Sequence, residues 1–194
     1  MGEKIDRRVR KTRSQLRAGL ARLMQKKSIK EITVKELVEE VDINRSTFYL
    51  HYTDIYQMLE CIEGELMDEI TTAIQSLPAD PINDGGSFSF ITDMFYFLSE
   101  NQDICNALLG PNGDMAFVAK IERLIAKTIL ERLSDRFPKE IKDISYAYAF
   151  CLTGCVGMVK AWLSSEQQDT PEHMAKITYD LICNTVHNYI ETLS

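Results

Sequence analysis

Apolar residues recur along most of this chain at the three- and four-residue spacing of an α-helix. A compact example follows Thr33, where one helix face is built from Val34, Leu37, Val38 and Val41. Thr33 and Glu36, three residues apart, form the sequence pattern of a capping box. The pattern predicts a short helix that begins directly after Thr33.

A second, even shorter helix is predicted after a polar break at residues 42–44. Asn44, the last residue of that break, is of a type that favours the N-cap position. Polar residues lead the new helix and aromatic residues follow them: Arg45, Ser46 and Thr47, then Phe48, Tyr49 and Tyr52. Two helices joined by a short turn form a helix-turn-helix, whose second helix can lie in the major groove of DNA.

Helical periodicity continues on both sides of this motif, and no alternation typical of β-strands appears. The longer helices are predicted at residues 5–26, 54–77, 87–98, 104–109, 115–137, 141–163 and 171–192. Residues 78–87, rich in proline, glycine and acidic or amide side chains, form a loop between two of them. The chain is therefore expected to be all-α.

The residues of the helix-turn-helix resemble the DNA-binding domain of TetR-family transcriptional regulators. The most specific part of the resemblance is the run Thr-Phe-Tyr-x-His-Tyr-x-Asp at residues 47–54. Several positions differ from the usual family pattern. Ser46 replaces another small residue, and Lys27 or Ser28 stands where a glycine usually follows the first helix. Asp42 replaces the glycine of the turn, which is acceptable because Asp readily adopts turn conformations. Ile55 replaces a lysine that reaches a DNA phosphate, so one backbone contact is not expected here.

Residues 108–117, LLGPNGDMAF, are similar to the C-terminal domain of a subset of TetR-like regulators from Gram-positive bacteria. Together the resemblances imply a helix-turn-helix DNA-binding domain at residues 1–53 and a helical regulatory and dimerisation domain at residues 54–194. They also imply a homodimer formed through the last two helices, residues 141–163 and 171–192. A two-fold pair of short recognition helices reads the two half-sites of a palindrome.

The distribution of charge supports a DNA-binding end. The whole chain has a net charge of −7, but residues 1–52 carry 13 Lys or Arg against 7 Asp or Glu, a net of +6. The remaining residues carry 9 against 22, a net of −13. Five basic side chains lie close together near the start: Arg7, Arg8, Arg10, Lys11 and Arg13. Because contacts with phosphates supply most non-specific affinity, double-stranded DNA is the expected partner of this end.

Side chains near the ends of the two short helices are candidates for contacts with the DNA backbone. Thr33, Lys35 and Tyr49 carry the hydroxyl and amine groups that commonly position a protein on phosphates. His51 is expected either to touch a phosphate or to cap its helix.

The front of the second helix supplies the candidates for base contacts. The guanidinium of Arg45 suits guanine, and the methyl group of Thr47 suits thymine. Ser46 is small enough to let the helix approach the DNA closely. Packing beneath the helix, rather than a DNA contact, is expected of Phe48.

The family resemblance implies an effector pocket inside the C-terminal domain. Its candidate lining residues are Met58, Ile62, Met94, Phe95, Leu98, Leu108, Phe117, Phe150 and Trp162. Aromatic and Met side chains at helical spacing are more often ordinary core than ligand contacts. An effector that prefers one arrangement of the two DNA-binding domains shifts the population toward it and changes DNA affinity. The alternative is a co-activator or protein-interaction module whose C-terminal domain binds a partner protein.

Other function classes find little support in the sequence. No glycine-rich phosphate loop, H-E-x-x-H or G-x-S-x-G motif is present, so no catalytic residues are expected. The five cysteines lack zinc-ligand spacing, so neither a metal nor a cofactor is expected. Cys151 and Cys155 share a helix face, so a redox switch between them is an alternative that the sequence leaves open. No apolar run reaches about 18 residues and no secretory signal is present, so we expect a cytoplasmic protein with no membrane partner.

Overall fold

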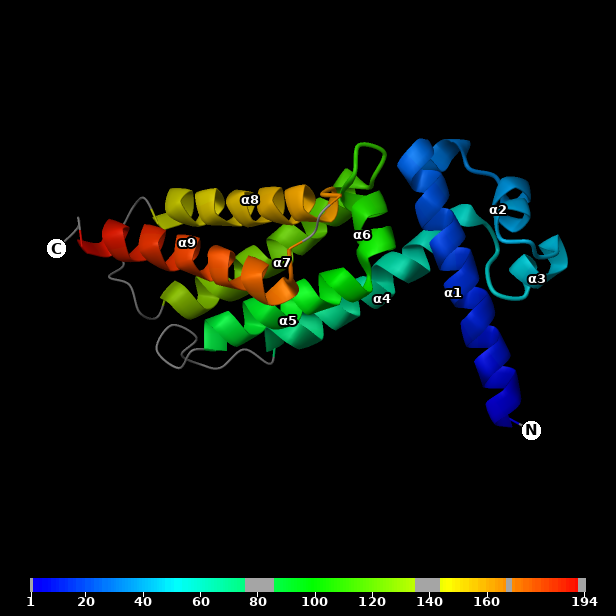
Figure 1. Ribbon diagram of the computed structural model, residues 1–194, viewed down its shortest axis with the longest axis horizontal. Coiled ribbons are helices and arrows are strands. Elements are labelled where there is room, and N and C mark those ends of the chain that lie inside the picture. The colour runs from blue at the N-terminus through cyan, green and yellow to red at the C-terminus, as the bar shows by residue number, and fades with distance from the viewer. Residues whose placement is uncertain (1, 76–85, 135–143, 167–168, 192–194) are drawn as a thin grey trace. The chain divides into compact units, whose positions relative to one another are not determined.

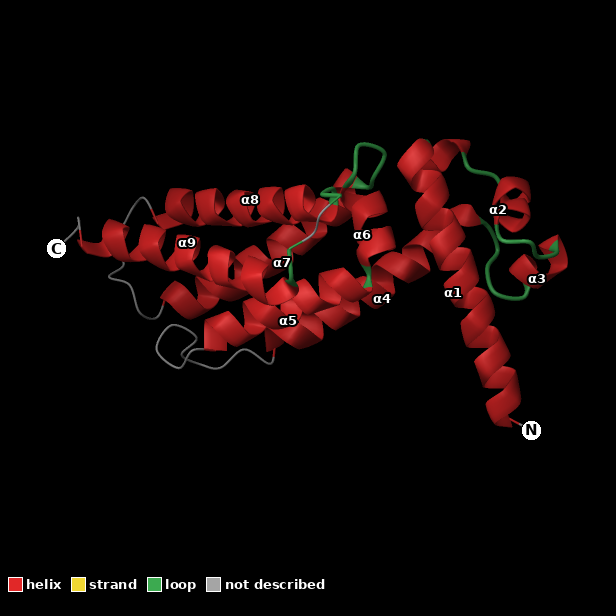
Figure 2. Cartoon of the chain, in the orientation of Figure 1, coloured by secondary structure: helices red, strands yellow, loops and turns green. Residues whose placement is uncertain are grey.

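A computed structural model describes residues 2–75, 86–134, 144–166 and 169–191 (Figure 1). The secondary structure of these residues is entirely helical, which confirms the all-α class (Figure 2). In chain order the helices are α1 (Gly2–Lys26), the short 3-10 helix η1 (Ile29–Glu31), α2 (Val34–Glu40), α3 (Arg45–Tyr49), α4 (Ile55–Gln75), α5 (Gly86–Glu100), α6 (Gln102–Leu109), α7 (Met115–Ser134), α8 (Ile144–Leu163) and α9 (Pro171–Glu191).

Three helices begin earlier than the apolar pattern predicts. α1 begins at Gly2 rather than at residue 5, α5 at Gly86 rather than at residue 87, and α6 at Gln102 rather than at residue 104. α6 extends over polar residues ahead of its apolar positions, because Asp103 lies in its first turn, where an acidic side chain interacts favourably with the helix dipole. The described residues exclude most of the predicted loop at residues 78–87 and the helix ends predicted at residues 76–77, 135–137, 141–143 and 192.

The chain forms two compact units. The first combines Met1–Met67 with Gln102–Val118, and the second combines Asp68–Asn101 with Ala119–Ser194. α4 therefore contributes to both units, and α6 with the turn after it belongs to the first. This division describes packing, whereas the expected functional division between residues 53 and 54 stays a prediction.

Apolar side chains build the core of the first unit, in which Leu37 and Val38 of the predicted apolar face are buried and Val34 and Val41 are half-buried. Its side chains from α1 to the start of α4 are at most 8% exposed: Leu16, Leu20, Ala21, Leu23, Met24, Ile32, Leu37, Val38, Phe48, Tyr52, Ile55, Met58 and Leu59. Each short helix buries one apolar face in this core. Burial of these faces is the main force that holds α2 and α3, which are too short to be stable alone.

α1 and α2 approach each other closely at Gly19. A Cβ atom at this position would lie under 3.0 Å from Val41 Cγ1 and 3.2 Å from Leu37 Cδ1. Beside this crossing, Arg22 Nε donates a hydrogen bond to Glu40 Oε1 at 2.6 Å. The absence of a side chain at Gly19 therefore sets the distance between α1 and the helix-turn-helix.

Within the first unit, α6 packs along α1. The turn after α6 reaches the C-terminal end of α1, where Asn112 Nδ2 donates to the carbonyl oxygen of Gln25 at 3.5 Å. Gly113 allows this turn to close, because a Cβ atom there would lie under 3.0 Å from the carbonyl oxygen of Leu108. The segment 108–117 thus holds its shape through its own backbone and contacts α1.

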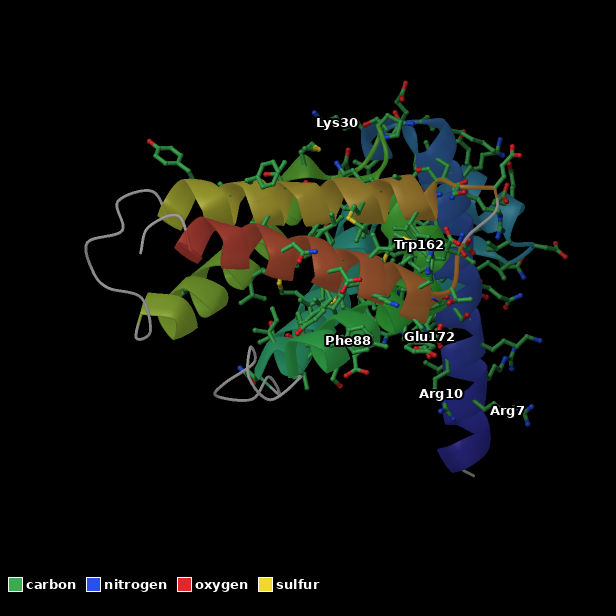
Figure 3. All side chains as sticks on the ribbon, turned by 60° about the vertical axis from the view of Figure 1, so that its left-hand side comes forward. Arg7, Arg10, Lys30, Phe88, Trp162 and Glu172 are labelled. Atoms are coloured by element: carbon green, nitrogen blue, oxygen red, sulfur yellow. The ribbon has the colours of Figure 1, made fainter. Side chains whose placement is uncertain are left out.

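In the second unit, α5 and α9 pack along each other and α8 packs beside α9. Phe95 of α5 meets Trp162 of α8 edge-on with ring centroids 5.2 Å apart, and Phe88 meets Tyr179 of α9 at 5.5 Å. Trp162 Nε1 donates to the carbonyl oxygen of Asp169 at 2.8 Å, so the polar atom of this buried ring is paired. Figure 3 labels Phe88 and Trp162 among these helices.

Candidate nucleic-acid interface

The start of α2 is fixed by the capping box that the sequence predicts. Glu36 N–H donates to Thr33 Oγ1 at 3.2 Å, and Thr33 N–H donates to Glu36 Oε2 at 3.0 Å. Lys27 Nζ also donates to Glu36 Oε1. The hydrogen bond from Lys27, followed by those from the backbone and side chain of Thr33, lowers the pKa of Glu36 from 4.5 to about 2. The ionised carboxylate therefore ties the segment after α1 to the start of α2.

The turn between α2 and α3 accommodates Asp42 without loss of its geometry. Asp42 has a φ of 52°, in the left-handed region. Its N–H donates to the carbonyl oxygen of Glu39 at 3.4 Å, and Ile43 N–H donates to that of Val38 at 3.0 Å. These are the two hydrogen bonds of a Schellman motif, which ends a helix. Asp is among the few non-glycine residues that tolerate this conformation, so the turn ends α2 without needing a glycine.

α3 spans only five residues, Arg45–Tyr49. Asn44 occupies the predicted N-cap position with an extended backbone, but its side chain makes no capping hydrogen bond. Its carbonyl oxygen instead accepts hydrogen bonds from the N–H groups of Thr47 at 2.9 Å and Phe48 at 3.3 Å. The helix therefore begins where the sequence predicts, through backbone bonds alone.

Phe48 determines which face of α3 points outward. Its side chain is fully buried, and its ring centroid lies 5.4 Å from that of Tyr49 and 5.8 Å from that of Tyr52. With Phe48 directed inward, Arg45 and Ser46 are exposed and Tyr49 is 57% exposed. The buried aromatic ring therefore holds a polar face of α3 toward solvent.

Behind α3, Tyr52 connects the helix-turn-helix to α1. The guanidinium carbon of Arg13 lies 5.7 Å from the centroid of the Tyr52 ring, which is a cation–π distance. Burial raises the pKa of Tyr52. Partial burial, and then the charge of Arg13, lower the pKa of His51. A neutral His51 ring offers a single N–H donor rather than a positive charge to a phosphate.

The seven predicted DNA-contact residues all belong to the first unit, with different exposure. Five are exposed, namely Thr33, Lys35, Arg45, Ser46 and Tyr49, and two are partly buried, namely Thr47 and His51. The Thr33 hydroxyl already donates to Glu36 Oε2 at 3.0 Å and accepts from the Glu36 N–H. Lys35 Nζ lies 3.9 Å from Glu39 Oε1 in an exposed pair, which is weak enough for the amine to exchange partners.

Ile55 is a core residue at the position where a phosphate-binding lysine would stand. It is buried and is the first residue of α4. Asp54 caps the helix, since Gln57 N–H donates to Asp54 Oδ1 at 2.8 Å. Thr53 N–H in turn donates to Gln57 Oε1 at 3.2 Å. A buried aliphatic side chain offers no donor to a phosphate, and the absence of this backbone contact stays a prediction.

Basic side chains continue along α1. Arg7 and Arg10 project from its first turns (Figure 3), and Arg7, Arg8 and Lys11 are exposed. Arg13 NH1 lies 3.8 Å from Glu65 Oε1, with both side chains about half exposed. The cationic surface of the first unit therefore extends beyond the helix-turn-helix.

Two residues of this unit are not singled out by the sequence reasoning. Gly19 sets the spacing of α1 and α2, and its signal is an isolated glycine inside a helical pattern. Leu50, directly after Tyr49, is 81% exposed. In the sequence, Leu50 could have been noticed as an apolar residue that does not fall on the buried face to which Phe48 and Tyr52 belong.

The candidate pocket residues are divided between the two units. Buried members in the first unit are Met58, Ile62, Leu108 and Phe117, and in the second unit they are Phe95, Leu98 and Trp162. Met94 is partly buried, and Phe150 is 69% exposed. The buried members have the environment of an ordinary core, whereas Phe150 lies on the surface of its unit.

Among the described residues, no group of three His, Cys, Asp or Glu side chains is arranged to hold a metal ion. Burial raises the pKa of Cys151, and burial followed by the neighbouring Cys151 raises the pKa of Cys155 to about 11. Both thiols are therefore held in the protonated, weakly nucleophilic form. No helix in the described part of the chain combines the length and apolar character needed to cross a bilayer.

Known proteins match this chain in sequence family and in fold. Residues 87–184, just over half of the chain, match the family model for the TetR-type "Transcriptional regulator C-terminal region". No curated protein matches this chain in sequence. A TetR transcriptional regulator from Streptococcus agalactiae 2603V has a similar structure, with a TM-score of 0.58 and 21% identity, over 94% of this chain and 99% of that chain.

Two further solved structures share the fold. A TetR-family transcriptional regulator from Streptomyces coelicolor has a TM-score of 0.64 and 15% identity, over 91% of this chain and 83% of that chain. The dihydroxyacetone kinase operon activator DhaS has a TM-score of 0.58 and 15% identity, over 91% of this chain and 96% of that chain. At these identities the likeness concerns the fold.

Proposed function

The chain belongs to the TetR family of transcriptional regulators, and we propose that it is a repressor that binds a palindromic operator as a homodimer under effector control. One observation carries the DNA-binding part of this proposal. Buried Phe48 holds the polar face of α3 outward in the unit that contains the basic N-terminal segment. A short helix that presents Arg45 and Tyr49 in a cationic setting is suited to the major groove.

In the proposed complex, the DNA-binding domain is residues 1–53. Arg45 and Thr47 contact base edges, and Ser46 lets α3 approach them. The remaining predicted contacts are to phosphates and come from Thr33, Lys35, Tyr49 and His51. The engagement of the Thr33 hydroxyl in the α2 cap supports a secondary role for it, because a phosphate would have to compete with Glu36.

The exposed face of α8 supports a homodimer formed through α8 and α9. Tyr146 is 74% exposed and Phe150 is 69% exposed. Along the same helix, Gly154 and Gly157 have no atom within 4 Å of an added Cβ. Exposed aromatic side chains beside glycines suit close packing against a second helix. A dimer would place two copies of the five-residue α3 on the two half-sites of a palindrome.

We further propose that residues 54–194 transmit the presence of an effector to the DNA-binding domain. An effector acts by binding better to one arrangement of the two DNA-binding domains than to the other, and DNA affinity changes by the coupling free energy. The buried apolar residues Phe95, Leu98 and Trp162 are candidates for its contacts. The protein acts where its DNA lies, in the cytoplasm, and has no enzymatic activity.

The second candidate is a co-activator whose C-terminal domain binds a partner protein. The acidic charge of residues 53–194, 22 Asp or Glu against 9 Lys or Arg, supports it. So does the description of one structural neighbour as an operon activator. The two candidates differ in whether a small molecule or a protein changes DNA binding.

The test is selection of binding sites from pooled random duplex DNA by the purified protein. A palindromic consensus is expected, and size-exclusion chromatography with light scattering should give the mass of a dimer. Arg45→Ala should relax base preference at one position of each half-site, whereas Arg123→Ala, an exposed basic residue of α7, should leave the consensus unchanged. Retention of DNA without any enriched sequence would contradict the proposal.

The role of the effector is tested on the selected operator. A small-molecule extract and a protein fraction from the same cells are added separately to the protein–DNA complex. Release of the operator by the small-molecule extract supports a ligand-controlled repressor. A change that only the protein fraction causes supports the co-activator.

A further inference from the structure

Leu50 has a more exposed side chain, at 81%, than any other large hydrophobic residue in the described part of the chain. A single exposed leucine needs no explanation by itself. Its position is what matters, because Leu50 follows α3 directly and its backbone is still helical, with φ −72° and ψ −18°. Its N–H donates to the carbonyl oxygen of Ser46 at 3.2 Å, so it extends the outer face of α3 by one position.

The helical spacing places Leu50 among the proposed DNA contacts. Residues four apart lie on the same side of a helix, so Leu50 stands over Ser46 just as Tyr49 stands over Arg45. Ser46 is small and exposed and leaves space beside the leucine. The buried rings of Phe48 and Tyr52 lie on either side of Leu50 in sequence and fix its direction. The backbone of Leu50 is therefore fixed, and its side chain is an exposed apolar group on an otherwise polar face.

The DNA major groove presents one apolar group to such a side chain, the C5-methyl group of thymine. We propose that Leu50 contacts this methyl group and makes one position of each half-site specific for thymine. The inference rests on the proposed function, since it requires α3 to enter the major groove. The net charge of +6 on residues 1–52, which include Leu50, favours DNA over an apolar protein surface as the occupant, because the neighbouring side chains Arg45 and Ser46 stay polar in the contact.

Uracil substitution tests the inference, because uracil differs from thymine only by lacking the C5-methyl group. Each thymine of the selected operator is replaced in turn by uracil in both half-sites, and dissociation constants are measured for the wild-type protein and for Leu50→Ala. Loss of one buried methyl-sized group should weaken wild-type binding about fourfold per half-site. The same uracil should have no effect on Leu50→Ala.

Two further variants separate the methyl contact from general damage. Met115→Ala removes another exposed apolar side chain of the first unit and should keep the wild-type response to every uracil. Leu50→Met keeps an apolar side chain of similar volume and should restore part of the response. Circular dichroism should give the same melting temperature for Leu50→Ala as for the wild type, because the residue is exposed.

Three results would overturn the inference. If no uracil weakens the wild type, or if Leu50→Ala responds to every uracil as the wild type does, Leu50 reads no thymine methyl. If Leu50→Ala keeps the full DNA response and loses a response to a partner protein, Leu50 is a protein contact. Failure of the selection to return any operator is a different result, since it overturns the proposed function and this inference with it.

Discussion

Replacing Gly19 with alanine adds one methyl group where α1 and α2 are closest. The methyl carbon would lie under 3.0 Å from Val41 Cγ1, 3.2 Å from Leu37 Cδ1 and 3.6 Å from Glu40 Cγ. Val41 is β-branched and has few alternative rotamers. Leu37 is fully buried in the core. The overlap is therefore relieved only when α2 moves away from α1 or Val41 adopts a less favourable rotamer.

Two effects of opposite sign determine the change in the free energy of unfolding. Alanine is more stable than glycine in a helix interior by about 0.5–1 kcal/mol. Overpacking a well-packed site costs about 1–3 kcal/mol. The overpacking term is larger, so we expect Gly19→Ala to lower the free energy of unfolding by about 1–2 kcal/mol.

Gly64→Ala is the matched control. Gly64 also lies inside a helix of the first unit, in α4, but no atom lies within 4 Å of an added Cβ. This variant should therefore gain about 0.5–1 kcal/mol from helix propensity alone. Because both variants share the propensity gain, the difference between them measures the overlap at the crossing of α1 and α2.

Urea unfolding followed by far-ultraviolet circular dichroism gives the two free energies. Hydrogen exchange measured by mass spectrometry should show faster exchange across Val34–Glu40 in Gly19→Ala and no change there in Gly64→Ala. Operator binding should weaken in Gly19→Ala as α2 is displaced. A Gly19→Ala protein as stable as Gly64→Ala, with unchanged exchange in α2, would refute the reasoning.

Three other predictions follow from the first unit. The pKa of Glu36 is lowered from 4.5 to about 2, so the stability that its carboxylate contributes is present above pH 4.5 and is lost as the pH falls toward 2. In an acid titration, Glu36→Gln should therefore lose less stability over that pH range than the wild type. Tyr49→Phe should weaken binding to all DNA sequences about tenfold with an unchanged salt dependence, because the lost hydroxyl is neutral; equal affinity of the two proteins would remove its phosphate role. Gly113→Ala should lower the free energy of unfolding by about 2 kcal/mol and the melting temperature by about 4–8 °C, because the new methyl group meets the backbone of Leu108. An unchanged melting temperature would show that the turn is not constrained.

The helix-turn-helix itself is predictable from the sequence because its geometry depends on neighbours in the chain. The cap at Thr33 and Glu36 joins residues three apart, and the turn at Asp42 closes through hydrogen bonds within five residues of sequence. Interactions of this kind form wherever the right residue types stand at the right spacing. The inward direction of Phe48 follows equally from its place on the apolar side of α3.

The effector pocket is the part that apolar periodicity cannot predict. The same pattern marks a core residue and a ligand contact, so it gives Trp162 and Phe150 the same status. In the structure Trp162 is buried against Phe95, whereas Phe150 is 69% exposed. Periodicity can identify a buried face only when a helix has one apolar side. α8 is nearly apolar all round, so the helices that pack against it decide which of its sides is covered.

The sequence alone thus determined the helical class, the helix-turn-helix and the basic surface, because each depends on residue types and on spacings of a few residues. Only the tertiary structure decided which residues that are far apart in the sequence contact each other. It brought Asn112 to the carbonyl oxygen of Gln25, 87 residues away, and it set Gly19 against Val41. It also left Leu50 exposed beside the proposed DNA contacts. Such contacts are fixed by how whole helix faces pack against each other, and a local pattern carries no record of the partner face.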